Sequence, residues 1–93
     1  MTVQKQDDGK HGKYFILEND TEVASMTFTW AGTQKFIIDH TEVDASQKGK
    51  GLGLELLKTA VEDARTNGLK IIPLCPFANA MMRKHKELQD VLR

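Results

Sequence analysis

A glycine-rich segment with two lysines lies near the middle of the chain. Residues 48–53 read Lys-Gly-Lys-Gly-Leu-Gly and precede an apolar stretch with helical spacing. Glycine lets the backbone approach a ligand closely, and the amides at a helix N-terminus converge on an anion. The spacing matches neither the P-loop nor the Rossmann fingerprint, which needs glycine where Leu54 stands. The segment is either a pyrophosphate-binding loop or a flexible helix start, and its lysines favour phosphate.

His40 and Glu42 end a strand-like segment just before this loop. Residues two apart on a strand lie on one face, about 6–7 Å apart. Both side chains can therefore serve the same reacting proton, directly or through water, and each is a candidate general base. The alternative is that His40 is an ordinary strand histidine that hydrogen-bonds a neighbouring residue, and that Glu42 is a solvated carboxylate at the sheet edge.

Cys75 is the single cysteine and follows a short apolar run. Ligands of open sheets bind outside the carboxyl ends of strands, so the thiol is expected to face the crevice that the glycine loop rims. There it can act as nucleophile or proton donor. The alternative is an inert core cysteine.

The remaining histidines, His11 and His85, have no partners at a metal-ligand spacing, so no metal is expected. The basic residues 83–86 are either a solvated helix end or a grip for a cofactor phosphate.

Size and composition restrict these candidates to one small domain. The chain has 93 residues, 40% of them hydrophobic and 28% charged, as is typical of a globular fold with a single core. Thirteen basic residues balance thirteen acidic ones, which disfavours nucleic acid and anionic membranes as partners. No apolar run approaches the roughly 20 residues of a membrane span. With no signal sequence and no cysteine pair, we expect a cytoplasmic protein that is a monomer or a weak dimer.

The elements that position these residues follow from hydrophobic periodicity. Residues 1–12 are polar and lack a period, so we expect a flexible end before a single domain over residues 13–93. Aromatic and β-branched residues, then a clean alternation, then a run joined by a short connection predict three antiparallel strands. The leucine spacing after the glycine loop predicts a long helix. The next apolar run predicts a parallel strand that Pro73 leaves unpaired on one side. The expected fold is α+β with the order β-β-β-α-β-α. Its first five elements lie near residues 14–18, 22–30, 35–43, 51–67 and 69–74, and residues 77–85 and 87–92 form one or two short helices at the end.

Together these motifs resemble the GNAT acetyltransferases, most closely their minimal single-domain YjdJ-like branch. That branch carries a D-H-T-x-V strand, a G-x-G-[LIV]-G loop, a helix ending near A-R-x-N-[GN]-L-K, an I-[IP]-x-C segment and a closing Q-D. This chain has the corresponding residues at 39–43, 49–53, 64–70, 72–75 and 89–90. The loop also fits the wider GNAT motif [RQ]-x-x-G-x-[GA], with Lys48 at its first position.

The resemblance implies that coenzyme A binds at the glycine loop and that its pantetheine arm runs between two splayed strands, residues 35–43 and 69–74. It implies that the candidate catalytic cysteine of the branch is Cys75. The cofactor-binding residues that it implies are Val43, Lys48, Gly49, Lys50, Gly51, Leu52, Gly53, Cys75, Phe77 and Asn79.

The resemblance further implies an acetyl-CoA-dependent N-acetyltransferase that acts on a primary amine. Glu42 or His40 would remove the amine proton, and a strand amide near Val43 would stabilise the thioester oxygen. Cys75 would either accept the acetyl group or protonate the departing thiolate, with direct transfer preferred. The segment that walls the acceptor groove in larger GNAT enzymes is missing, so we expect an open site for a protein lysine or amino terminus. The alternative is a CoA-binding or acyl-CoA-binding module without catalysis.

Overall fold

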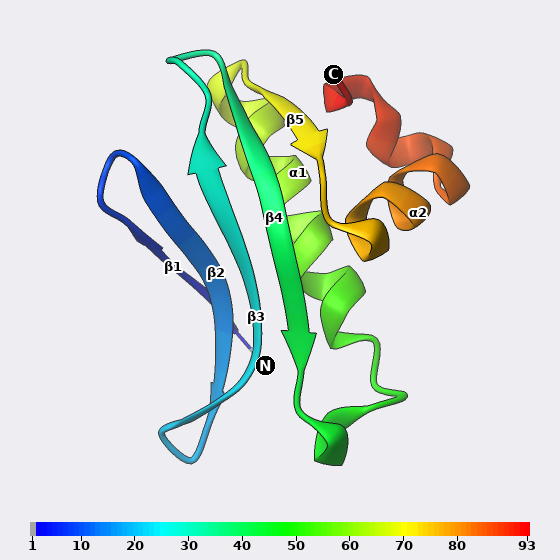
Figure 1. The fold of residues 1–93 in the computed structure, drawn as a ribbon. Coiled ribbons are helices and arrows are strands. Elements are labelled where there is room, and N and C mark those ends of the chain that lie inside the picture. The colour runs from blue at the N-terminus through cyan, green and yellow to red at the C-terminus, as the bar shows by residue number, and fades with distance from the viewer. Residues whose placement is uncertain (1) are drawn as a thin grey trace.

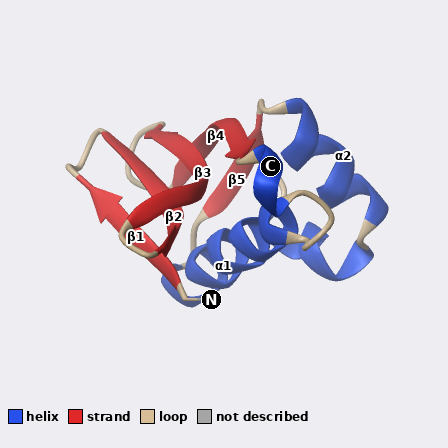
Figure 2. Ribbon diagram, turned by 90° about the horizontal axis from the view of Figure 1, so that it is seen from below, coloured by secondary structure: helices blue, strands red, loops and turns tan. Residues whose placement is uncertain are grey.

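The computed structural model describes residues 2–93, which build one twisted sheet with its helices gathered on one face (Figures 1 and 2). The first four strands are antiparallel neighbours in chain order, and the fifth joins parallel to the fourth after a helical crossover. The strands are β1 (Val3–Asp7), β2 (His11–Glu18), β3 (Thr21–Trp30), β4 (Lys35–Val43) and β5 (Lys70–Pro73). The helices are α1 (Leu52–Asn67) and α2 (Pro76–Lys84), with 3₁₀ turns at Ala45–Gln47 and Lys86–Val91.

The core forms where the apolar face of the sheet meets α1. Alternate residues of β2, β3 and β4 supply one side, and the helical stripe predicted from the leucine spacing supplies the other. Gly68 ends α1 with φ 67°, and its N–H bonds the carbonyls of Ala64 and Arg65. Within residues 2–93, no helix is both long and apolar enough to cross a membrane. The buried residues at this interface include Tyr14, Ile16, Met26, Phe28, Phe36, Ile38, Leu56, Leu57, Ala60 and Val61.

One extra residue in β4 changes which side chains face the helices. Phe28 of β3 pairs with Ile38, but the preceding Thr27 pairs with His40, so Asp39 forms a bulge. Side chains alternate between the two faces of a strand, so the inserted residue moves each later side chain of β4 to the opposite face of the sheet. Ile38 is buried, whereas His40 is exposed. Strict alternation would have turned His40 towards the core.

The prediction that residues 1–12 form a flexible end is wrong for Val3–Asp7, which form the edge strand β1. Only Val3 packs against the core, so an edge strand of this kind carries almost no hydrophobic signal. Polar contacts hold it instead: Lys5 Nζ lies 2.6 Å from Asp63 Oδ2 of α1, and Trp30 Nε1 donates to Asp7 Oδ1 at 2.9 Å. The element order therefore begins with four strands rather than three.

The closing motif residues clamp the C-terminus onto α1. Arg65 donates from Nε and Nη2 to the two carboxylate oxygens of Asp90, at 2.7 and 2.6 Å. These bonds lower the pKa of Asp90. Gln89 Nε2 donates to the carbonyls of Met82 and Arg83 at the end of α2. The Q-D pair and the arginine of the A-R-x-N motif thus act together as a structural lock.

Asp63 joins β1 and β2 to α1 through two hydrogen bonds. Its Oδ2 accepts from Lys5 Nζ and, at 2.7 Å, from the hydroxyl of Tyr14. Burial raises the pKa of Tyr14, and the bond to Asp63 raises it further. Burial alone would also raise the pKa of Asp63, but the bonds from Lys5 and Tyr14 outweigh it, so that this pKa is lowered.

We expect Asp63→Asn to lower the free energy of unfolding at pH 7 by about 1–2 kcal/mol, because hydrogen bonds to a charged acceptor are lost. A carboxyl group with a lowered pKa stabilises the fold above its unfolded pKa, and this contribution disappears on acidification. Urea unfolding of both proteins should therefore converge below about pH 4. Glu62→Gln, at a side chain that is 67% exposed, is the matched control and should change stability by at most about 0.5 kcal/mol. A difference for Asp63→Asn that persists undiminished at pH 3 would contradict this account.

Candidate functional site

Strands β4 and β5 diverge after a short paired stretch. Their ladder ends at the pair Ile38 and Pro73, and Cys75 N donates to Ile38 O at 2.9 Å as the last link. Pro73 has no N–H, and Leu74 N turns back to Ile72 O at 3.0 Å. Within residues 2–93, the ladder leaves positions 39–43 of β4 without a partner on this edge. As predicted, β5 is unpaired on one side at Pro73: it is the edge strand of the sheet, and within residues 2–93 Pro73 pairs only with Ile38 of β4.

Val43 presents its peptide N–H to this open edge. The next amide, Asp44 N, donates to Val23 O of β3 at 2.8 Å. Because successive peptide groups of a strand point to opposite sides, the N–H of Val43 points away from β3. It is therefore directed to the side that β5 has left, where it can donate to a ligand.

The glycine loop leads from β4 into α1 with two left-handed residues. Gly49 has φ 85° and Gly51 has φ 72°, conformations that favour glycine. Gly51 is the N-cap of α1 and offers no side-chain oxygen to the first turn. The amides of the first turn have no acceptor within the helix, and the helix dipole adds positive potential there. The loop can therefore bind an anion such as a diphosphate.

Gly53 serves a different purpose from the glycines before it. A Cβ at this position would lie 2.8 Å from Cζ of Phe77, closer than side chains tolerate. The missing side chain lets the ring of Phe77 pack directly on the first turn of α1. Gly53 thus joins the beginnings of α1 and α2, a packing role that the glycine motif alone did not indicate.

A cavity of about 390 Å³ connects the open edge of β4 with the glycine loop. Seven of the predicted cofactor-binding residues line it: Val43, Lys48, Gly49, Gly51, Leu52, Gly53 and Phe77. Four further lining residues were missed from sequence: Thr41, Gln47, Leu54 and Met81. Leu54 and Met81 have the spacing of helical core residues, so the sequence predicts no contact with a ligand for them. Gln47 lies in a polar segment, in which nothing predicts burial or a place in the cavity wall.

The other three predicted cofactor-binding residues, Lys50, Cys75 and Asn79, do not line the cavity. The Cys75 thiol is buried, and its Sγ is 3.3 Å from Oγ1 of Thr41, which does line the cavity. Asn79 donates from Nδ2 to Pro73 O at 3.3 Å and accepts from Arg83 Nε at 2.7 Å. Its side chain thereby fixes the chain where β5 ends and α2 begins.

The two candidate bases form a pair on the opposite face of β4. His40 Nε2 lies 3.0 Å from Glu42 Oε1, and the side chains are 66% and 72% exposed. The bulge at Asp39 directs this pair to solvent and turns Thr41 towards Cys75. The structure therefore brings His40 and Glu42 together, but it separates them from Cys75 by the thickness of the strand.

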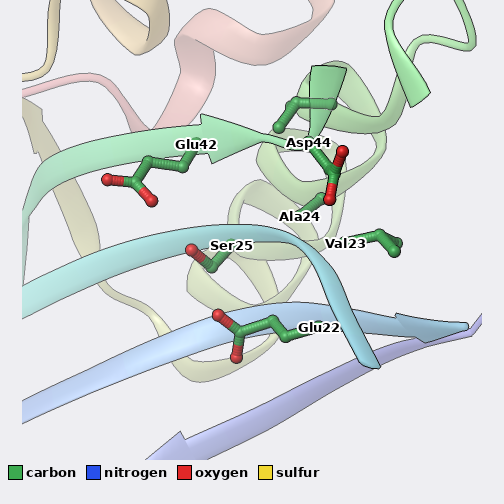
Figure 3. A pocket seen from close by; sticks show the side chains of 7 residues that line it. Glu22, Val23, Ala24, Ser25, Glu42 and Asp44 are labelled. Carbon is green, nitrogen blue, oxygen red and sulfur yellow. The ribbon is translucent and has the colours of Figure 1, made fainter. Parts of the chain in front are cut away.

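A second hollow, of about 190 Å³, lies where β3 and β4 meet the 3₁₀ turn (Figure 3). Its wall includes the carboxylates of Glu22, Glu42 and Asp44 as well as Ser25. The backbone N–H of Ser46 bonds the carboxylate of Asp44 and lowers its pKa. Val43 lines this hollow and the larger cavity, so the acidic hollow adjoins the open edge of β4.

Comparison with known proteins identifies the family and the fold. A family model for the GCN5-related N-acetyl-transferase matches residues 13–91. A GCN5-like candidate N-acetyltransferase from Staphylococcus aureus is 34% identical with a TM-score of 0.78, over 99% of this chain and 87% of that one. No curated protein matches the chain.

Two more distant structures share the fold. A ribosomal-protein-alanine N-acetyltransferase from Brucella melitensis is 16% identical with a TM-score of 0.69, over 83% of this chain and 62% of that one. An aminoglycoside acetyltransferase from an uncultured soil metagenomic sample is 13% identical with a TM-score of 0.67, over 84% of this chain and 58% of that one.

The chain therefore belongs to the GCN5-related N-acetyltransferase family. The family and the α+β fold expected from the sequence are confirmed, and the chain falls in an acyltransferase class of enzymes.

We expect Gly53→Ala to destabilise the protein by about 1–3 kcal/mol through overpacking against Phe77, although alanine is the better helix former. Phe77→Leu should relieve the clash, so the double variant should lose less stability than the two single losses together. A double-mutant cycle of thermal unfolding measures this coupling. Additive losses would show that the ring of Phe77 does not impose glycine at position 53.

Proposed function

We propose that this protein transfers an acetyl group from acetyl-CoA to a primary amine. One observation carries the proposal: a single cavity joins the amides at the start of α1 to the open edge of β4. A ligand with a diphosphate at one end and an amide-bearing arm at the other would find hydrogen-bond partners along its length. We place the reaction in the cytoplasm, where the Cys75 thiol stays reduced, and in a monomer or weak dimer.

The residues of the cavity fit coenzyme A by their chemistry. The amides of the first turn of α1 suit a diphosphate, and the side chains of Lys48 and Lys50 add positive charge. The backbone amides of these two lysines already donate to Ala45 O and Gln47 O. Apolar side chains from α1 and α2, Leu52, Leu54, Phe77 and Met81, suit the aliphatic part of the arm. Acetyl-CoA supplies an acetyl group activated as a thioester.

The amine substrate must lose a proton to become a nucleophile, and Glu42 is our candidate base with His40 as its partner. Their 3.0 Å contact and their exposure allow a proton accepted by one to pass through the other to solvent. The Val43 amide, directed to the open edge, is suited to stabilise developing charge on the carbonyl oxygen.

Cys75 contributes on the other side of the strand. Its thiol is held by Thr41 at the edge of the cavity, where it can protonate a departing thiolate or accept the acetyl group. We favour direct transfer to the amine, because the thiol is only 3% exposed and lies on the face opposite to the candidate base. An acetylated Cys75 detected by intact-mass spectrometry during turnover would contradict this preference.

The acceptor side of the site is open. The helices leave the outer face of the sheet uncovered (Figure 2), and Leu74 at the end of β5 is 69% exposed. The neighbouring acidic hollow would attract a cationic amine. We therefore propose a lysine or amino terminus of a protein as the acceptor, since such a group can reach a flat surface that would hold a small metabolite poorly.

Acetyl-CoA at about 100 times its dissociation constant should raise the free energy of unfolding by about 2.7 kcal/mol. Gly51→Ala should weaken its binding about tenfold, because a side chain disfavours the left-handed conformation of the loop. Gly32→Ala is a matched control: its φ of 79° gives similar strain and nothing lies within 4 Å, but it is in the β3–β4 turn. Isothermal titration should show weaker binding for Gly51→Ala alone. Equal affinities for both variants would remove the loop from the binding site.

Glu42→Gln should lower kcat with a peptide amine at least 100-fold while leaving acetyl-CoA affinity unchanged, because a general base contributes about 10²–10⁴. Glu22→Gln is the control for charge in the same hollow and should change kcat less than tenfold. Release of CoA measures turnover over a panel of peptide and small-molecule amines. Tight acetyl-CoA binding with no turnover on any amine would favour a binding module instead, and turnover confined to small molecules would refute the proposed protein acceptor.

A further inference from the structure

Gln47 is a buried polar side chain in the wall of the cavity. It is 4% exposed, whereas its neighbours Ser46 and Lys48 are exposed. Its Nε2 donates to Glu18 Oε1 of β2 at 3.0 Å. A carboxylate only accepts hydrogen bonds, so Glu18 determines which end of the amide is the nitrogen. The oxygen, Oε1, is consequently held away from Glu18.

Oε1 of Gln47 is buried and has no hydrogen-bond partner among residues 2–93. Buried acceptors in native proteins are nearly always paired, because an unpaired one loses its bonds to water without compensation. Gln47 lies between two parts of the site, the Val43 end of β4 and the lysine-glycine segment that begins at Lys48. A ligand that spans these parts passes the one buried polar residue of the described chain.

The chemistry of the ligand indicates which part of it can meet this oxygen. A diphosphate offers only acceptors at neutral pH, so it cannot satisfy a carbonyl oxygen. The pantetheine arm carries two secondary amides, each with an N–H donor. We propose that Gln47 Oε1 accepts a hydrogen bond from an amide N–H of the pantetheine arm, an inference that rests on the proposed binding of coenzyme A.

The bond to Glu18 anchors the amide nitrogen of Gln47 and leaves the oxygen for a ligand. That oxygen has almost no accessible surface in this structure, so it meets the arm only when the loop around position 47 opens slightly on binding. The anchor to Glu18 keeps the rotamer freedom lost on binding small. Gln47 would therefore discriminate between ligands that carry the amide arm and nucleotides that lack it. The loop amides alone would not make this distinction.

The test compares two probes, CoA and its nucleotide half, 3′-phospho-ADP, which has no pantetheine arm. Gln47→Met keeps the length of the side chain but removes both the acceptor and the donor. We expect it to weaken CoA binding about tenfold in isothermal titration, as expected for one lost hydrogen bond. Its effect on 3′-phospho-ADP should stay below twofold. Glu18→Ala, which removes the anchor but keeps the acceptor, should weaken CoA binding less than Gln47→Met does.

Equal weakening of both probes by Gln47→Met would mean that Gln47 only shapes the loop, and no weakening of either would mean that it has no part in binding. Both outcomes overturn the inference while leaving the proposed function intact. A parent protein that binds neither probe would instead refute the proposed function itself.

A double variant keeps the test decisive if Gln47→Met does not fold. Gln47→Glu with Glu18→Gln exchanges the pair and retains an acceptor oxygen at position 47. Thermal unfolding should show a folded protein, and CoA affinity should lie within about threefold of the parent. Folded protein with CoA binding tenfold weaker or worse would contradict the inference.

Discussion

The end of pairing between β4 and β5 is the constraint on which the site depends. The backbone amides of a strand normally hydrogen-bond the neighbouring strand. They can therefore donate to a ligand only where the neighbouring strand diverges. Pro73 cannot donate, and Leu74 turns back to Ile72, so the ladder stops while β4 continues to Val43. The cavity, the free edge and the beginning of α2 at Pro76 all follow from this one departure.

The bulge at Asp39 determines which polar side chains of β4 face solvent and which face the helices. Before it, β4 buries Phe36 and Ile38; after it, the inward positions pass to Thr41 and Val43. A strand of unbroken alternation would have turned His40 and Glu42 towards the apolar core, where burying a polar pair carries a desolvation cost. One inserted residue thus permits a hydrophobic core and a polar pair on the same strand.

The sequence predicted what periodicity encodes and missed what it does not. Leucine spacing gave α1 to within one residue, and alternation gave β3 and β4, because both elements bury one face against the same core. The edge strand β1 buries only Val3 and is held by polar contacts, so it leaves no pattern. The bulge at Asp39 is invisible for a similar reason: it depends on the register with β3, which no local pattern records. The burial of Gln47 depends on Glu18, 29 positions away in the chain.

The alternation of β4 also restricts how an acyl transfer could proceed here. Thr41 and Glu42 are adjacent, so their side chains lie on opposite faces, and the Thr41–Cys75 contact is kept apart from the His40–Glu42 pair. A group held at the free edge between β4 and β5 would have the thiol on its inner side and the base on its outer side. An amine arriving from the uncovered face of the sheet would meet Glu42 before it met Cys75. Deprotonation of the nucleophile and protonation of the leaving group would then occur on different sides of one strand, so that neither residue could take over the role of the other without a change of register.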